Sequence, residues 1–226
     1  MLRTLPYRGG RLLFAVPALS GLLLASACKA PQVDPSELWT EASAWQLSQM
    51  QALIDDWTFA AQAAESLPLA LLAGADSLTQ RYRLLVVAEE RCIDSAHSLP
   101  YFDALAKSSN QLELRVVDSQ VGRSLLDRYR TPDGRGATPT VVVLDDDGTV
   151  RGCWIERPAE LQSWWISNPD GITPTDQYRA KTEWYRADRG KHAVAELLQV
   201  LHAADQGAFI CGVPLEPSLE MPQPGL

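Results

Sequence analysis

The 226-residue chain is 46% hydrophobic and has a formal net charge of −8, with 28 acidic against 20 basic side chains. A chain of this size can bury one good-sized hydrophobic core. Its acidic balance argues against a nucleic-acid partner, because phosphates are repelled by such a surface. Mixed helix and strand signals favour a single α/β domain with an N-terminal extension.

Residues 1–27 are predicted to be an export signal rather than part of the fold. Arg3, Arg8 and Arg11 form a basic start, and Leu12–Leu24 supplies a short apolar run. Removing this segment leaves 17 basic and 28 acidic residues, a net charge of −11.

Small residues lead up to Cys28 in a pattern that resembles a bacterial lipobox, although Ala25 stands where leucine is usual. The resemblance implies cleavage before Cys28 and lipid attachment to it. The protein would then be anchored in the cell envelope, facing the periplasm, and Lys29 favours the outer membrane. An ordinary secretory cleavage site and an uncleaved anchor are the alternatives, but the apolar run is short for a spanning helix of about 20 residues.

Residues 28–80 are predicted to form a polar tether and a helical extension. Between Glu37 and Ala64, apolar residues recur at steps of three and four, which indicates one amphipathic helix. We expect this helix to pack on the domain. The alternative, a helix lying on a membrane, is disfavoured because its polar face carries Asp55 and Asp56 rather than lysines.

Residues 81–206 alternate strand and helix signals as a βαβ unit followed by a hairpin. The expected strands are 83–88, 112–117, 140–144 and 150–155, and the expected helices are 93–108, 121–129, 158–165 and 177–204. The predicted fold class is therefore α/β, a central mixed sheet flanked by helices. Residues 207–226 contain four prolines and are predicted to be a Pro-rich tail.

Cys92 lies where the first of these strands meets a helix. Thiolate is the reactive form of cysteine, and unpaired N–H groups at a helix N-terminus stabilise it. Arg91 would add to that stabilisation, whereas Glu89 and Glu90 would oppose it. The alternative interpretation is a buried, inert cysteine.

Two prolines bear on the same site. Pro100 follows Cys92 by eight residues, inside the predicted helix, where proline normally costs about 3 kcal/mol. Thr138-Pro139 stands just before a predicted strand. A cysteine and two prolines in this layout resemble the thioredoxin family, in which the later proline is cis and faces the reactive sulfur.

The similarity is closest to a bacterial subgroup with a W-C-G-D-type site, a G-G-R-x-x-P loop, a G-x-W-x-x-R-P segment and a W-Y-x-x-D-x-G stretch. The corresponding segments here are Arg91–Ser95, Gly134–Pro139, Gly152–Pro158 and Glu183–Gly190. The resemblance implies a thioredoxin-like fold, thiol–disulfide exchange with protein thiols or disulfides, and no cofactor. By that resemblance, the catalytic residues are Cys92, Ser95 and Pro139, and the residues at the substrate are Arg91, Ile93, Asp94 and Thr138.

The site also departs from the family's pattern. Arg91 replaces tryptophan, Ile93 replaces glycine, and Val86 stands where many thioredoxins have a buried acid. Ser95 replaces the second cysteine, whose thiol normally releases the enzyme from its mixed disulfide. Asp94, in the first turn of the helix, is interpreted as a helix cap or as a group that tunes Cys92.

The expected function is therefore capture of a partner by Cys92 as a mixed disulfide, or slow exchange helped by an external thiol. Whether this amounts to an oxidoreductase is left open by the missing cysteine. One alternative is a non-catalytic binding module. Another is a redox pair between Cys92 and either Cys153 or Cys211.

If Cys28 carries lipid, three cysteines remain, and an odd number leaves at least one thiol unpaired. We favour Cys153 and Cys211 as a bridge or as two buried thiols, with Cys92 free. No metal site is predicted, because the chain has no C-x-x-C and its histidines share no face with a cysteine. His97 is interpreted as a surface residue.

Overall fold

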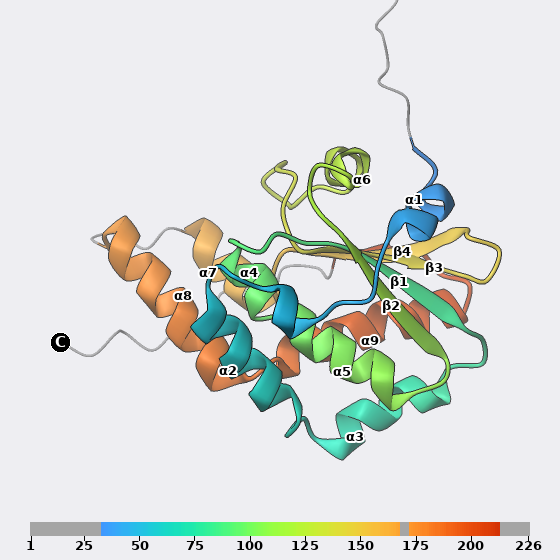
Figure 1. Ribbon diagram of the computed structural model, residues 1–226, viewed down its shortest axis with the longest axis horizontal. Helices are drawn as coiled ribbons and strands as arrows, with labels where there is room; N and C mark the ends of the chain where they lie inside the picture. Colours follow the sequence, from blue (N-terminus) through green and yellow to red (C-terminus); the bar gives the residue numbers. More distant parts are fainter. Residues whose placement is uncertain (1–32, 168–171, 213–226) are drawn as a thin grey trace, which may run out of the picture. The chain divides into compact units, whose positions relative to one another are not determined.

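The computed structural model describes residues 33–167 and 172–212. Their centre is a five-stranded sheet in the order β2-β1-β3-β4-β5 (Figure 1). β1 is parallel to β2 and antiparallel to β3, β3 is antiparallel to β4, and β4 is parallel to β5. The strands are β1 (Tyr82–Val87), β2 (Leu112–Val117), β3 (Thr140–Leu144), β4 (Val150–Ile155) and β5 (Ile210–Cys211). The predicted α/β class with a mixed sheet is confirmed.

The apolar runs in the sequence explain why the central strands are buried on both faces. Successive strand residues point to opposite sides, so Leu84 and Val86 enter one hydrophobic core while Leu85 and Val87 enter the other. Two layers of helices therefore cover the sheet.

Figure 1 shows α2, α5 and α9 on one face, and α1 and α6 on the other. α7 and α8 form a smaller third cluster at one end. The helices are α1 (Pro35–Glu41), α2 (Ile54–Ala64), α3 (Leu69–Leu72), α4 (Ile93–Ala96), α5 (Leu99–Ser108), α6 (Arg123–Arg128), α7 (Ala159–Ser167), α8 (Pro174–Asp188) and α9 (Lys191–Asp205), with 3-10 turns at Leu47–Gln49 and Ala73–Ser77.

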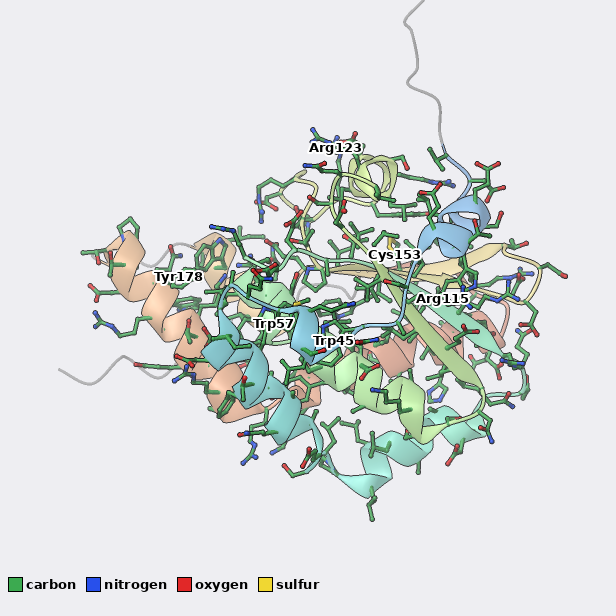
Figure 2. All side chains as sticks on the ribbon, in the orientation of Figure 1. Trp45, Trp57, Arg115, Arg123, Cys153 and Tyr178 are labelled. Carbon is green, nitrogen blue, oxygen red and sulfur yellow. A yellow bond between two sulfur atoms is a disulfide. The ribbon has the colours of Figure 1, made fainter. Side chains whose placement is uncertain are left out.

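The single helix predicted between Glu37 and Ala64 is wrong, because the chain breaks between α1 and α2. Ser43 instead pairs with the edge of β2: its N–H donates to the Val116 carbonyl at 3.1 Å and its carbonyl accepts from the Val116 N–H at 2.7 Å. α1 packs on the sheet through Leu38 and Trp39. Figure 2 shows Arg115 near α1, where its guanidinium lies 4.6 Å from the Trp39 ring.

The predicted helix over 93–108 is also interrupted, at His97 and Ser98. Pro100 therefore lies in the first turn of α5 rather than inside a longer helix. A missing N–H is harmless there, because the first N–H groups of a helix have no partner within it.

The predicted helix over 177–204 is likewise two helices. Arg189 and Gly190 take left-handed backbone angles between α8 and α9, and they turn the chain. A Cβ built on Gly190 would lie 2.2 Å from the Tyr101 ring, so only glycine fits there. Beyond α9, Ile210 and Cys211 form β5, within the segment predicted to be a tail.

Within the described ranges, none of the helices has the length and apolarity needed to cross a bilayer. The predicted signal segment, the predicted lipid site Cys28 and residues 213–226 of the predicted tail lie outside the described residues.

Candidate functional site

Cys92 lies at the end of the loop that follows β1, as the N-cap residue of α4. Its side chain is half-buried. The sulfur donates a hydrogen bond to the Thr138 carbonyl oxygen at 3.1 Å.

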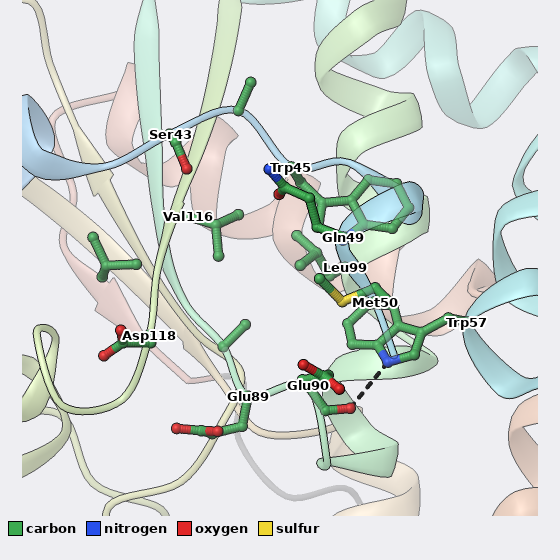
Figure 3. Close-up of a pocket in the computed structure, with 13 residues that line it drawn as sticks. Ser43, Trp45, Gln49, Met50, Trp57, Glu89, Glu90, Leu99, Val116 and Asp118 are labelled. Carbon is green, nitrogen blue, oxygen red and sulfur yellow. Dashed lines mark hydrogen bonds between the residues drawn. The ribbon is translucent and has the colours of Figure 1, made fainter. Parts of the chain in front are cut away.

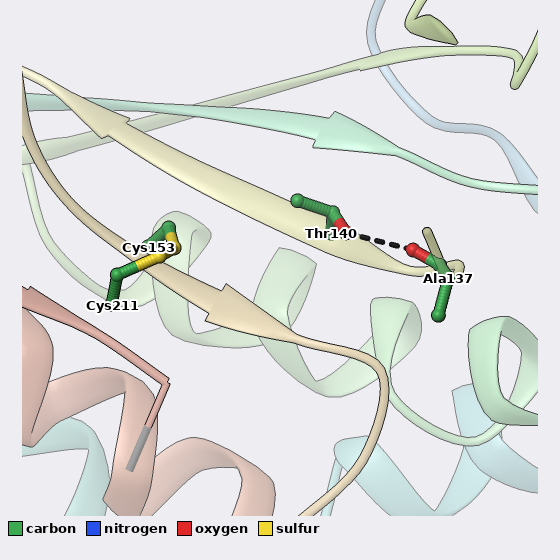
Figure 4. The surroundings of a disulfide bond; sticks show 4 residues. All are labelled: Ala137, Thr140, Cys153 and Cys211. Atoms are coloured by element: carbon green, nitrogen blue, oxygen red, sulfur yellow. Dashed lines mark hydrogen bonds between the residues drawn. A yellow bond between two sulfur atoms is a disulfide. The ribbon is translucent and has the colours of Figure 1, made fainter. Parts of the chain in front are cut away.

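The opposing loop is held in place from both sides. The Thr138–Pro139 peptide bond is cis. The Thr140 hydroxyl donates to the Ala137 carbonyl at 2.7 Å (Figure 4), and the Glu156 N–H donates to the Pro139 carbonyl at 2.7 Å. Sequence positions 92 and 138 are thus brought together, with the Thr138 carbonyl fixed against the sulfur.

The other predicted site residues differ in exposure. Arg91 is exposed and Thr138 is half-buried, whereas Pro139 is buried. Ile93 and Ser95 retain only 4% and 0% of their exposed area. The Ser95 hydroxyl oxygen accepts a hydrogen bond from the Glu89 N–H at 3.4 Å. A large partner can therefore reach Arg91, Cys92 and Thr138 directly, but not Ile93 or Ser95.

The Asp94 side chain is buried, and its hydrogen bonds go to other side chains rather than to the first N–H groups of α4. It is 4% exposed and lies in a cluster of donors from the end of the molecule that carries α8. The Tyr185 hydroxyl donates to Oδ1 at 2.6 Å, and Lys181 Nζ donates to Oδ2 at 2.8 Å. Arg157 Nη2 also donates to Oδ2, at 3.3 Å. The predicted cap and substrate contacts are therefore replaced by a buried ionic cluster, in which a carboxylate is stable because it is paired.

The cluster extends through the two residues that follow β4, Glu156 and Arg157, to the loop before Pro139. Arg157 also bonds the Glu156 carboxylate, and Arg135 bonds both oxygens of Glu156, at 3.1 and 3.0 Å. Burial alone would lower the pKa of Arg157, but the charges of Asp94 and Glu156 raise it above its usual value. Trp165 covers the guanidinium at 4.8 Å.

Two tyrosines of α8, Tyr185 and Tyr178, lie beside this cluster. Burial, followed by the charge of Asp94, raises the pKa of Tyr185 well above its usual value, so its hydroxyl stays a donor. Tyr178, labelled in Figure 2, is more exposed, and its ring lies 5.2 Å from Lys181 Nζ.

His97 is fully buried, so its interpretation as a surface residue is wrong. α4 ends at Ala96, and the ring turns inward to stack on Tyr185 at 5.0 Å. Nε2 lies 3.2 Å from the Asp56 carboxylate. Burial lowers the pKa of His97 although Asp56 opposes that shift.

Glu89 and Glu90 tie the loop before Cys92 to neighbouring segments. The Glu89 carboxylate bonds Ser119, and the Glu90 carboxylate accepts from the Gln51 N–H at 3.2 Å and from the Ala52 N–H. The Trp57 indole donates to the Glu90 carbonyl at 3.0 Å (Figure 3). Beside these residues lies a cavity of about 330 Å³. Its lining combines indole rings and acidic side chains and includes Trp45, Trp57, Met50, Glu89, Glu90 and Asp118.

Cys153 and Cys211 form a disulfide, and Cys92 is the free cysteine of the described residues (Figure 4). The favoured pairing is confirmed, and a disulfide between Cys92 and either of these residues is not formed.

In the described part of the chain, no three His, Cys, Asp or Glu side chains come together as a metal site.

Sequence reasoning missed the partners of Asp94. Arg157 and Tyr185 stand in two segments that carried the family resemblance, but no role was assigned to them. Lys181 gave no signal, because a lysine in a polar helix is ordinarily exposed.

Comparisons with known proteins agree with this architecture. The family model described as Thioredoxin matches residues 36–177. No curated protein matches the sequence.

Two solved structures share the fold. One, a protein of unknown function from Pseudomonas aeruginosa, is 23% identical with a TM-score of 0.59, over 76% of this chain and 99% of that chain. The other, an HIV epitope-scaffold, is 22% identical with a TM-score of 0.58, again over 76% of this chain and 99% of that chain. At these sequence identities, the two structures are evidence for the fold alone.

Proposed function

This chain belongs to the thioredoxin family, and from that premise we propose that it captures protein partners through a mixed disulfide at Cys92. We further propose that it does so in the cell envelope, held by lipid on Cys28. The observation that carries the proposal is that Cys92 is only half-buried, with its sulfur 3.1 Å from the Thr138 carbonyl oxygen.

The chemistry begins with loss of the proton from Cys92. The thiolate attacks one sulfur of a partner disulfide, the partner's S–S bond breaks, and its second sulfur leaves as a thiolate that takes up a proton. The product is a mixed disulfide between Cys92 and the partner. An extended partner segment pairs with the backbone at Thr138, as a strand added to an edge.

Release needs another thiol. The Ser95 hydroxyl cannot supply it, because its proton is far too tightly held for the hydroxyl to act as a thiolate does. The partner's freed thiol, or an external thiol, attacks the mixed disulfide and frees Cys92 as a thiolate, which is reprotonated. The adduct therefore persists until such a thiol arrives.

The test is to trap adducts in cells that express the full chain and to separate them without reductant. We expect Cys92-linked adducts in the membrane fraction and none with Cys92→Ser. Ser95→Cys is the matched variant, because it restores a thiol at the resolving position and should shorten the adduct's lifetime at least tenfold. Absence of adducts in the wild type, with alkylation of Cys92 no faster than that of a free thiol, would contradict the proposal.

A non-catalytic binding module is the second candidate. The contact that engages the Cys92 sulfur with the Thr138 carbonyl, and the lack of a resolving thiol at Ser95, favour it. Cys92→Ala distinguishes the two, since a binding module would keep its partners and a mixed-disulfide protein would lose them.

A further inference from the structure

The cavity of about 330 Å³ in Figure 3 lies at the carboxyl ends of the parallel strands β1 and β2. Its described lining includes residues of the segment between α1 and α2, Trp57 of α2, and residues at the ends of the two strands. In open α/β sheets, ligands bind outside the carboxyl ends of the strands. The cavity therefore stands where this kind of sheet places a binding site.

Hydrogen bonds hold the walls of this cavity in place. The Glu90 carboxylate accepts from the Gln51 N–H at 3.2 Å, and the Trp57 indole donates to the Glu90 carbonyl at 3.0 Å. The Ser43 N–H donates to the Val116 carbonyl at 3.1 Å. The segment between α1 and α2 is thus fixed against both strand ends, so the cavity is formed without a ligand.

One side of the cavity is aromatic. The ring centroids of Trp45 and Trp57 lie 6.0 Å apart, and Met50 lies with them on the right of Figure 3. A lysine or arginine side chain suits such a wall, because its methylene stem packs on apolar surface and its cation is attracted to the face of an indole ring.

The other side carries negative charge. Figure 3 shows Glu89 and Asp118 on the left, opposite the indole rings, with Glu90 between them. None of these three acids forms an ion pair with a basic side chain of residues 33–167 or 172–212. The cavity therefore combines three unpaired negative charges with two indole rings.

Each of these carboxylates also keeps one oxygen free. Oε1 of Glu89 bonds Ser119, Oε1 of Glu90 bonds two backbone N–H groups, and Oδ1 of Asp118 bonds two others. The second oxygens of Glu89 and Glu90 bond no described group, yet they are not buried from water. A cation that enters the cavity can pair with them.

The cavity is also close to the candidate nucleophile. Glu90 precedes Cys92 by two residues, so their Cα atoms are at most about 7 Å apart. The Cys92 N–H donates to the Glu89 carbonyl at 3.1 Å. A partner chain held at Cys92 can therefore place a neighbouring side chain in the cavity.

We propose that this cavity binds a lysine or arginine side chain, and that it selects partners with such a residue near the cysteine that reacts with Cys92. The second part rests on the proposed function. The occupant is basic because the cavity's acids and indole rings both attract a cation, and charge complementarity of this kind gives specificity.

The binding itself is tested without any reaction at Cys92. The purified protein is titrated with Nα-acetyl-lysine methylamide, a single capped residue, and the indole N–H signals of Trp45 and Trp57 are followed by NMR. We expect saturable shifts of both signals. Capped norleucine has a similar stem without the charge, and we expect it to cause no such shifts.

Glu90→Gln should weaken the binding of capped lysine about fivefold. The amide oxygen still accepts from the Gln51 and Ala52 N–H groups, so only the charge is lost. Glu183→Gln is the matched control, because Glu183 is an exposed acid of α8 that does not line the cavity. Equal shifts with norleucine, unchanged affinity in Glu90→Gln, or equal weakening in the two variants would overturn the proposal.

Rates of adduct formation test the selection. Peptides with one cysteine, joined by a disulfide to thionitrobenzoate, carry lysine or norleucine at each flanking position in turn. The Cys92 thiolate attacks the peptide sulfur, that S–S bond breaks, and thionitrobenzoate leaves as a coloured thiolate. We expect one lysine position to react about fivefold faster than its norleucine counterpart, and this advantage to vanish in Glu90→Gln but not in Glu183→Gln.

The two experiments separate the selection from the capture. Adducts that form at equal rates with lysine and norleucine peptides would overturn the selection and leave the capture intact. Binding of capped lysine without any adduct would overturn the capture, and the selection with it, while the cavity would still be a site for a basic side chain.

Discussion

Asp94 stands two residues after the candidate nucleophile Cys92, and its side chain is buried. Val86, where many relatives have their acid, is instead part of the hydrophobic core. Asp94 offers both carboxylate oxygens to Tyr185, Lys181 and Arg157. Asp94 thus fixes α4 to α8 and to the segment that follows β4.

Replacing Asp94 with asparagine should therefore be costly, because it leaves two buried cations without their shared anion. We expect Asp94→Asn to lower the free energy of unfolding by about 3 kcal/mol, measured by urea denaturation. Lys181→Met is the control: it leaves Asp94 paired with Arg157 and Tyr185, so its loss should be smaller. A smaller loss for Asp94→Asn than for Lys181→Met would show that the cluster does not stabilise the fold in this way.

At the scale of single residues, Cys92 and His97 show what could and what could not be predicted from the sequence. The approach of Cys92 to the 138–139 loop could be expected from the resemblance to the thioredoxin family, in which the later proline faces the reactive sulfur. The environment of His97 could not be predicted. The sequence predicts a continuous helix over residues 93–108, whereas α4 ends one residue before His97. Which way a side chain turns at a helix end depends on Tyr185 and Asp56, distant in sequence.

At the scale of elements, the junction between α8 and α9 depends on one glycine. A Cβ on Gly190 (φ +75) would lie 2.2 Å from the Tyr101 ring, whereas a Cβ on Gly207 (φ +76) would meet nothing within 4 Å. Gly207→Ala should cost about 1 kcal/mol for the left-handed backbone alone. Gly190→Ala should cost roughly 2 kcal/mol more, because the methyl group must displace the ring. Thermal or urea unfolding of both variants measures the difference, and equal losses would mean that Tyr101 moves aside freely.

The strands could be predicted closely and the helix breaks could not. Residues 112–117, 140–144 and 150–155 coincide with β2, β3 and β4, because short apolar runs between turn residues have few other ways to be buried. The break after α1 follows from Ser43 pairing with Val116 and from Glu90 bonding residues 51 and 52. These partners lie far along the chain, so the three- and four-residue periodicity of residues 38–64 carried no sign of them.

For the whole molecule, the disulfide ties the last described strand to the sheet. It joins residues 58 positions apart, and a loop of that length should contribute about 4 kcal/mol by restricting the unfolded chain. We expect the double variant Cys153→Ala, Cys211→Ala to lose about that much in urea unfolding. Cys92→Ala, the same chemical change at the free cysteine, should leave stability nearly unchanged. Equal losses in the two variants would contradict a stabilising bridge.

The placement of α9 has a consequence for how the protein is made. Val194, Leu197, Val200 and Leu201 complete the core over β1, β3 and β4, yet they are synthesised after all three strands. A nascent chain that stops at residue 190 has made the central strands, α2 and α5, but lacks the part of this core that α9 supplies. Domains generally fold as units during synthesis, so we expect the core on this face to close only after α9 has been made.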